Sequence, residues 1–104
     1  MNTFYVFITY FCIKIVSMYF EFDEQKSSTN KLKHGIDFIE AQRIWDDPER
    51  VEIPARTTEE PRIMIIGRIG HSIWTGIYTI RNNNIRLISV RKARKDEKEI
   101  YESL

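Results

Sequence analysis

The alternation of apolar and polar residues predicts a mixed α and β chain from Met18 onward. Residues Met18–Phe22 alternate as a short strand. Asp23 is placed as an N-cap, whose carboxylate accepts the free amide hydrogens at the start of a helix, and we expect that helix over Glu24–His34. Gly35 ends it, because glycine takes the left-handed conformation of a helix C-terminus without steric cost.

A second helix is indicated by Asp37 and by Glu40 three residues later, a spacing typical of a capping box. Its apolar face would consist of Phe38, Ala41, Ile44 and Trp45. Pro48 stops this helix after two aspartates, because proline cannot continue a helix and restricts the residue before it. We interpret the polar stretch Glu49–Pro61 as a connector.

Three β-rich runs follow the connector and predict an antiparallel meander. They are Arg62–Arg68, Ser72–Arg81 and Ile85–Arg91, separated by turn-forming glycine, histidine and asparagine residues. The charged tail Ala93–Ser103 carries apolar residues at helical spacing and predicts a closing helix against the sheet. The expected fold class is therefore α+β.

The N-terminus carries an apolar run, Phe4–Val16, of 13 residues interrupted by Lys14. A membrane helix needs about 20 residues, and a secretory signal would place positive charge ahead of the apolar stretch. We interpret residues 1–17 either as an extension ahead of a true start at Met18 or, if translated, as an added strand or a sticky tail. A single domain is expected over residues 18–104.

The bulk composition predicts one globular domain, since the chain has 104 residues, of which 42% are hydrophobic and 30% charged. Cys12 is its single cysteine, which excludes an internal disulfide and a cysteine-rich zinc site and is typical of a cytoplasmic protein. His34 and His71 lack the close pairing of zinc motifs. We therefore expect neither a metal nor another cofactor.

The net charge of +1 conceals an asymmetry between the two halves of the chain. Residues 1–50 carry six basic and eight acidic side chains, whereas the stretch Arg62–Lys95 carries eight basic residues and no acidic one. A field of one sign attracts polyanions, and phosphate is the expected counterpart.

Four separated motifs, in order, carry a resemblance to a known family: FEFDEQK, KHGIDFIEAQRIWDD, RIMIIGR and IRLISVRKARKDEKEIY. From Met18 to the C-terminus the chain resembles the BrnT family of toxins. The resemblance implies a compact RelE-like fold, ribonuclease activity that arrests translation, and neutralisation by a BrnA-like antitoxin encoded just downstream. It also implies a hetero-oligomer that binds DNA only through the antitoxin, and it favours Met18 as the start.

Three features depart from the family pattern. The turn with His71 and the loop Asn82–Asn84 are not recognisable family features, and Ile80 stands where the family often has a glutamate. Proton transfer by a carboxylate at that position is therefore left open.

RNA cleavage without a metal needs cations that stabilise the crowded phosphorane, and the planar fork of arginine can hold two phosphate oxygens. Four arginines lie at the margins of predicted strands, and we expect them to gather in one pocket sized for a phosphodiester: Arg62, Arg68, Arg81 and Arg91. Arg68 and Arg91 are the candidates for transition-state stabilisation. The candidates for substrate binding are Arg62, Arg81, Arg86 and Lys92. Alternatively, these are ordinary charges that protect sheet edges from aggregation.

His34 and its neighbour Lys33 are candidates for general acid and base chemistry, because an imidazole titrates near neutral pH. The alternative is that both residues simply stabilise the negative end of the helix dipole. His71 is interpreted as a polar residue of a surface turn.

The ribonuclease prediction competes with a second class of function. The sequence offers no unambiguous general base, which suits a noncatalytic module that binds nucleic acid or an acidic partner through its basic sheet. Toxicity relieved by a neighbouring gene would distinguish a toxin from such a module.

Overall fold

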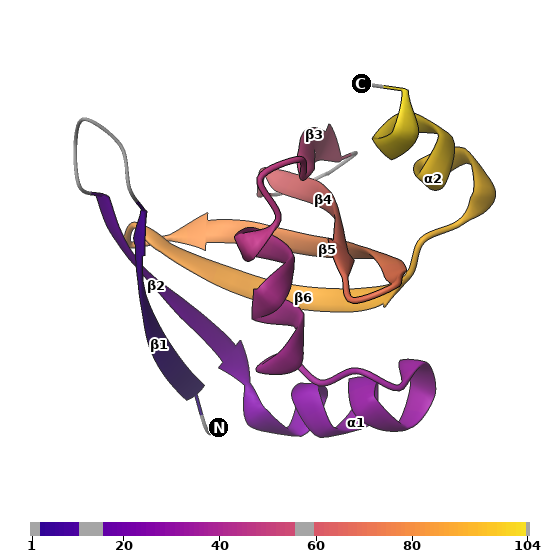
Figure 1. Ribbon diagram of the computed structural model, residues 1–104. Helices are drawn as coiled ribbons and strands as arrows, with labels where there is room; N and C mark the ends of the chain where they lie inside the picture. The colour runs from indigo at the N-terminus through magenta and orange to yellow at the C-terminus, as the bar shows by residue number, and fades with distance from the viewer. Residues whose placement is uncertain (1–2, 11–15, 56–59, 104) are drawn as a thin grey trace.

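The computed structural model describes residues 3–10, 16–55 and 60–103, and for residues 3–10 and 16–18 it describes the backbone alone. The elements are, in chain order, β1 (Thr3–Tyr10), β2 (Val16–Asp23), α1 (Glu24–His34), the 3-10 helix η1 (Glu40–Asp46), β3 (Val51–Ala55), β4 (Arg62–Ile69), β5 (Ser72–Arg81), β6 (Asn84–Lys92) and α2 (Lys95–Glu102). The fold is α+β, with one sheet and helices packed on it (Figure 1).

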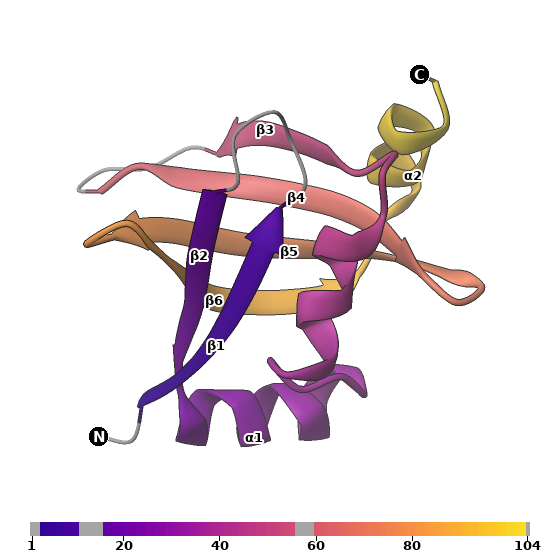
Figure 2. The same ribbon diagram turned by 60° about the vertical axis from the view of Figure 1, so that its left-hand side comes forward.

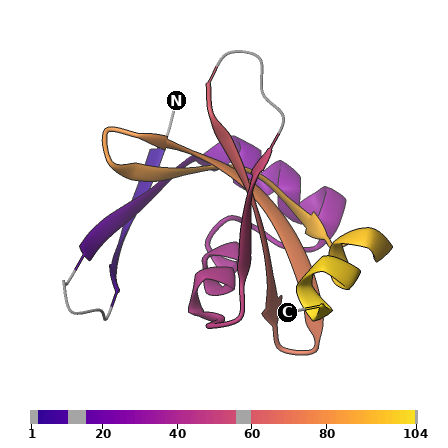
Figure 3. The same cartoon turned by 90° about the horizontal axis from the view of Figure 1, so that it is seen from above.

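The sheet has six strands in the order β1-β2-β6-β5-β4-β3. Neighbouring strands are antiparallel except β2 and β6, which pair in parallel through Phe20 with Ile85 and Glu21 with Arg86. Because this parallel contact is short, the hairpin of β1 and β2 crosses the direction of β4 and β5 at a steep angle (Figure 2). The hairpin and α2 lie on opposite sides of the molecule (Figures 1 and 3).

Most of the predicted elements are confirmed. The first helix spans the expected residues, Asp23 Oδ1 accepts hydrogen bonds from the backbone of Gln25 at 2.8 Å and Lys26 at 3.2 Å, and Gly35 adopts a φ of 79°. The antiparallel meander forms as β4, β5 and β6, and the tail forms α2. These are the places where local capping and turn rules operate within a few residues.

The interpretation of residues 49–61 as a connector without secondary structure is wrong, because they contain β3. This strand pairs with β4 from Val51 opposite Ile66 to Ala55 opposite Arg62, and it forms one edge of the sheet. Pro54 is compatible with that position, since an edge strand can spare a backbone donor.

The second helix differs from its prediction in type and in start. The capping box exists: Asp37 Oδ1 accepts from Glu40 N at 2.7 Å, and Glu40 Oε1 accepts from Asp37 N at 3.1 Å. The helix that follows is the 3-10 helix η1, which begins only at Glu40.

The stretch of residues 1–17 includes the strand β1, in agreement with the added strand that was one of the alternatives for this stretch. Cys12 and Lys14 lie outside the described residues.

The core has two parts, one on each face of the sheet. Ile65 and Ile66 are neighbours on β4 and both fully buried, yet they belong to different clusters because successive side chains point to opposite faces. The larger cluster joins the sheet to η1 through Trp45. The centre of the Trp45 ring lies 4.7 Å from the ring centre of Phe20 and 5.3 Å from that of Tyr78. The smaller cluster packs Tyr101 of α2 over Ile66.

A buried side chain, Asn30, fastens α1 to the sheet. Its amide nitrogen donates to the carbonyl oxygens of Ile36 and Val90, both at 2.8 Å, and its oxygen accepts from Val90 N at 3.3 Å. The same residue therefore fixes the loop after α1 and the strand β6 against one helix.

Replacing Asn30 by alanine should lower the free energy of unfolding by about 2 kcal/mol, because buried partners lose their hydrogen bonds. Chemical denaturation followed by circular dichroism measures this change. Thr29→Ala, at an exposed neighbouring position of α1, is the control and should shift stability by less than about 0.5 kcal/mol. Equal effects of both substitutions would contradict the assigned role of Asn30.

Candidate functional site

The four candidate arginines do not gather in one pocket, so that expectation is wrong. In the meander, Arg68 lies opposite Ile73 and Arg91 opposite Thr75, whereas Arg81 lies opposite Asn84 at the other end of the strands. Arg62 is at that other end too, six residues before Arg68, or roughly 20 Å along a strand at about 3.3 Å per residue. The sheet therefore separates the candidates into two groups.

At the end of the sheet that carries Arg62, the two other candidate arginines, Arg81 and Arg86, have acidic partners. The guanidinium of Arg81 lies 3.2 Å from a carboxylate oxygen of Glu60. Arg86 lies 3.2 Å from Glu21 across the parallel contact of β2 and β6, and both side chains are largely buried. Arg62 is exposed. The predicted contribution of Arg86 to substrate binding would require opening this buried ion pair.

Arg91 is also held in an ion pair. Its guanidinium donates to both carboxylate oxygens of Glu97, at 2.7 and 2.8 Å, and Glu97 is only 5% exposed. The same carboxylate accepts from the hydroxyl of Thr75 and from the backbone of Arg94 at the start of α2. The hydrogen bonds from Arg91 lower the pKa of Glu97 to about 2, against the opposing effect of burial. Arg91 thus anchors α2 to the sheet.

Arg68 is held by its backbone and keeps its guanidinium exposed. Its amide nitrogen donates to Asp47 Oδ2 at 2.8 Å, and the hydroxyl of Tyr101 donates to the same oxygen at 2.6 Å. The guanidinium carbon lies 5.6 Å from the centre of the Tyr101 ring, within the range of a cation–π contact. Burial raises the pKa of Tyr101, and the hydrogen bond to Asp47 raises it further, so the hydroxyl remains a donor at neutral pH.

A hollow of about 340 Å³ opens beside Arg68, between the turn that joins β4 to β5, the end of β6, and α2. We call it the Arg68 hollow, and its polar lining consists of Arg68, His71, Ser72, Lys92, Lys98 and Glu102. Three residues with cationic side chains and one with a carboxylate thus line the hollow, and within the described residues none of the three cations forms an ion pair. The ammonium of Lys92 lies 5.9 Å from the ring centre of Trp74, which packs against the larger core cluster, so this charge is at the margin of the hollow and toward the other face of the sheet.

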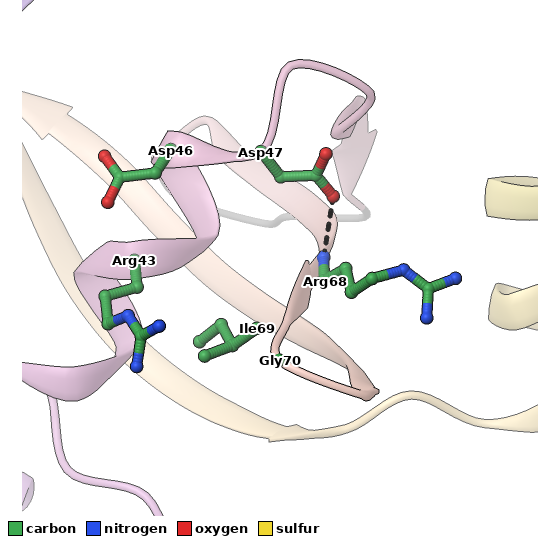
Figure 4. Close-up of a pocket in the computed structure, with 6 residues that line it drawn as sticks. All are labelled: Arg43, Asp46, Asp47, Arg68, Ile69 and Gly70. Atoms are coloured by element: carbon green, nitrogen blue, oxygen red, sulfur yellow. Dashed lines mark hydrogen bonds between the residues drawn. The ribbon is translucent and has the colours of Figure 1, made fainter.

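A second hollow, of about 220 Å³, lies on the other side of Arg68 and is lined by Arg43, Asp46, Asp47, Arg68, Ile69 and Gly70. Figure 4 shows the guanidinium of Arg68 pointing away from Arg43. Its two aspartates make this second hollow less suited to a polyanion than the Arg68 hollow.

The remaining candidates, Lys33 and His34, are exposed at the C-terminal end of α1. Helix α1 contacts β2 and β6 and packs against the larger core cluster, on the face opposite Tyr101 and α2. Neither residue lines either of the two hollows. Their catalytic role stays a prediction.

Sequence reasoning missed His71, Lys98 and Glu102. A usable signal was present, because in an antiparallel meander the turn after the first strand and the end of the third strand lie at the same end of the sheet. That rule places His71 beside Arg68 and Lys92. Lys98 and Glu102 needed the packing of α2, which only the structure supplies.

Among the residues that the structure describes, no group of three His, Cys, Asp or Glu side chains is arranged to hold a metal ion. Likewise, no helix in the described part of the chain has the length and apolar character needed to cross a bilayer.

Comparison with known proteins gives the class of this protein. Residues 22–97 match the model of a family described as "Ribonuclease toxin, BrnT, of type II toxin-antitoxin system". The match covers most of the chain, including α1, η1, β3 to β6 and the start of α2. A comparison with curated proteins finds no match.

The chain therefore belongs to the BrnT family of ribonuclease toxins. Membership in a type II system gives it a protein antitoxin as partner and RNA as target. The resemblance inferred from the sequence motifs is confirmed.

The pairing of Arg91 with Glu97 predicts a specific dependence of stability on pH. Because the folded pKa of Glu97 lies below its ordinary value of 4.5, the charged carboxylate stabilises the fold above that pH and loses its effect as the pH falls toward 2. Wild type should exceed Glu97→Gln in free energy of unfolding by about 3 kcal/mol at neutral pH, and the gap should narrow between pH 4.5 and pH 2.

Denaturant unfolding at a series of pH values measures this gap. Glu99→Gln removes an exposed carboxylate of the same helix and should follow the wild-type curve. A gap between wild type and Glu97→Gln that stays constant with pH would show that the charge of Glu97 is not the stabilising feature.

Proposed function

We propose that this toxin cleaves RNA without a metal ion and that the Arg68 hollow receives the phosphodiester group to be cut. The observation that carries the proposal is that Arg68, Lys92 and Lys98, from β4, β6 and α2, line one hollow, and that none of them forms an ion pair with another described residue. The volume of the Arg68 hollow, about 340 Å³, lies within the range of small-ligand sites, about 300 to 1,000 Å³.

The chemistry of RNA cleavage explains why such a hollow is suitable. When the 2′-hydroxyl attacks the adjacent phosphorus, negative charge accumulates on the non-bridging oxygens. A guanidinium that offers two parallel N–H groups matches those oxygens and stays charged at any relevant pH. Lys98 adds positive charge at the hollow and Lys92 at its margin, which strengthens binding of the RNA backbone in a salt-dependent manner.

Arg68 is positioned for this role by groups that are not themselves in the hollow. Asp47 holds its backbone, and Tyr101 lies against its guanidinium. An electrostatic catalyst of this kind is effective because its orientation is fixed before the reaction begins.

The wider biology of the toxin is also part of the proposal. Cleavage of RNA would arrest translation in the cytoplasm, and a BrnA-like antitoxin would neutralise the toxin by covering its basic surface. The joint hetero-oligomer would bind DNA through the antitoxin alone. A RelE-like arrangement of the domain is proposed on the same grounds, the resemblance of the sequence to the family.

Arg68→Ala should reduce the rate of RNA cleavage by about 100- to 1000-fold, the usual effect of removing one preorganised charge stabiliser. The assay is cleavage of a labelled single-stranded RNA in the presence of EDTA. Arg68→Lys should recover only part of the loss, because an ammonium lacks the two-pronged geometry.

Arg43→Ala is the matched control, since it removes an exposed arginine of the second hollow. The guanidinium of Arg68 points away from Arg43 (Figure 4). Wild-type cleavage by Arg68→Ala would reject the hollow as the site. Activity abolished by EDTA and restored by a divalent cation would reject metal independence.

Induced expression of the toxin should stop growth, and co-expression of the gene just downstream should restore it. The two proteins should then elute together from a size-exclusion column as a species larger than one-to-one. Harmless expression of folded protein would instead support the noncatalytic binding module.

A further inference from the structure

His71 occupies a fixed position at the rim of the Arg68 hollow. It is the second residue of the two-residue turn between Ile69 and Ser72, which are paired across β4 and β5. The first turn residue, Gly70, has a φ of 60°, whereas His71 has a negative φ, as in a type II′ turn. Such a tight turn leaves its second residue few backbone alternatives, so the imidazole is presented from a rigid part of the sheet.

Charged residues from each neighbouring element line the same hollow as His71. They are Arg68 on β4, Lys92 at the end of β6, and Lys98 and Glu102 on α2. Of these, the arginine and the lysines can bind phosphate but cannot accept a proton at neutral pH. The hollow thus contains binding groups for a phosphodiester and one imidazole, a group that can both accept and release a proton near pH 7.

We propose that His71 is the catalytic base of the reaction, an inference that rests on the proposed function of the Arg68 hollow. The neutral imidazole takes the proton of the 2′-hydroxyl as the 2′-oxygen forms a bond to phosphorus. The bond from phosphorus to the 5′-oxygen breaks, and that oxygen keeps the electron pair and takes a proton from water.

The products are a 2′,3′-cyclic phosphate and a 5′-hydroxyl, and the imidazolium returns its proton to the hydroxide left by that water. The mechanism makes the 2′-hydroxyl obligatory. The substrate class is therefore RNA, and a DNA strand of the same sequence can bind the cations but cannot be cut.

The two histidines of the chain, His34 and His71, allow a direct comparison. Both are exposed, so substitution of either should leave the fold intact. The sequence favours His34 as the acid or base, whereas the geometry favours His71, because His34 ends α1 on the other face of the sheet.

The experiment measures the pH dependence of single-turnover RNA cleavage for wild type, His71→Asn and His34→Asn. For wild type the rate should rise with pH, because the base must be neutral to accept a proton. His71→Asn should lose this rise and about 100-fold or more of the rate at pH 7. His71→Gln gives a second test with a longer side chain, and thermal unfolding checks that each variant is folded.

Binding of a 2′-O-methyl RNA, which cannot react, separates catalysis from affinity. His71→Asn should bind it with an affinity within about threefold of wild type, whereas Arg68→Ala should bind it more weakly. Retention of the wild-type rate and pH profile by both His71 variants would overturn the proposal. Loss of the pH-dependent rise in His34→Asn alone would overturn it in favour of His34.

These outcomes are distinguishable from failure of the proposed function. If Arg68→Ala is inactive while His71→Asn is not, the hollow stands as the site and only the role of His71 falls. If wild type does not cleave RNA, or if Arg68→Ala cleaves at the wild-type rate, the proposed site falls and the role of His71 falls with it.

Discussion

One carboxylate, Asp47, holds together the end of the molecule that carries the candidate site. It accepts hydrogen bonds from the backbone of Glu49 and Arg68 and from the hydroxyl of Tyr101, so it joins the end of η1 to β4 and to α2. Burial acts to raise the pKa of Asp47, but these hydrogen bonds outweigh it and the pKa lies below its ordinary value. The carboxylate of Asp47 therefore remains charged at physiological pH. Its hydrogen bond with Tyr101 helps to hold α2 in the position where this helix lines the Arg68 hollow.

The pairing of charges explains how a stretch that is uniformly basic in sequence becomes a selective surface. Acidic residues from outside that stretch reach back to it: Glu60 to Arg81, Glu21 to Arg86 and Glu97 to Arg91. These partners pair with three of the basic side chains, whereas Arg68, Lys92 and Lys98, which line the Arg68 hollow, form no ion pair within the described residues. The surface is selective because some cations are neutralised by acidic partners and others are not. The number of cations alone does not distinguish the two ends of the sheet.

The sequence was sufficient for elements whose ends are set by local interactions. Asp23 and Gly35 delimit α1 because each acts on backbone groups within a few residues, and the turn residues set the meander in the same way. The sequence was not sufficient for β3, whose strand character comes from pairing with β4, while Glu52 and Pro54 look like connector residues in isolation. The family was predictable from separated motifs that occur in the right order.

The candidate site was predictable only in part. Arg68 and Lys92 were identified, but an arginine at a strand margin looks the same in sequence whether it is exposed or paired with an acid far along the chain. Arg86 and Glu21 are 65 residues apart, and no local pattern connects them. Strand alternation and order would have separated Arg62 and Arg81 from Arg68, because antiparallel neighbours reverse direction at each turn.

The ion pair of Glu21 and Arg86 has a consequence for how the chain assembles. These two residues are directly opposite each other in the parallel contact between β2 and β6, which comprises two residue pairs. Because this parallel pairing is so short, its backbone hydrogen bonds do little to fix the register of the two strands. A shift of one strand by one residue would move the charge of that strand to the other face and separate it from its partner, and an uncompensated buried charge costs several kcal/mol. The salt bridge thus favours one register when the first hairpin pairs with the meander, which is synthesised some 60 residues later.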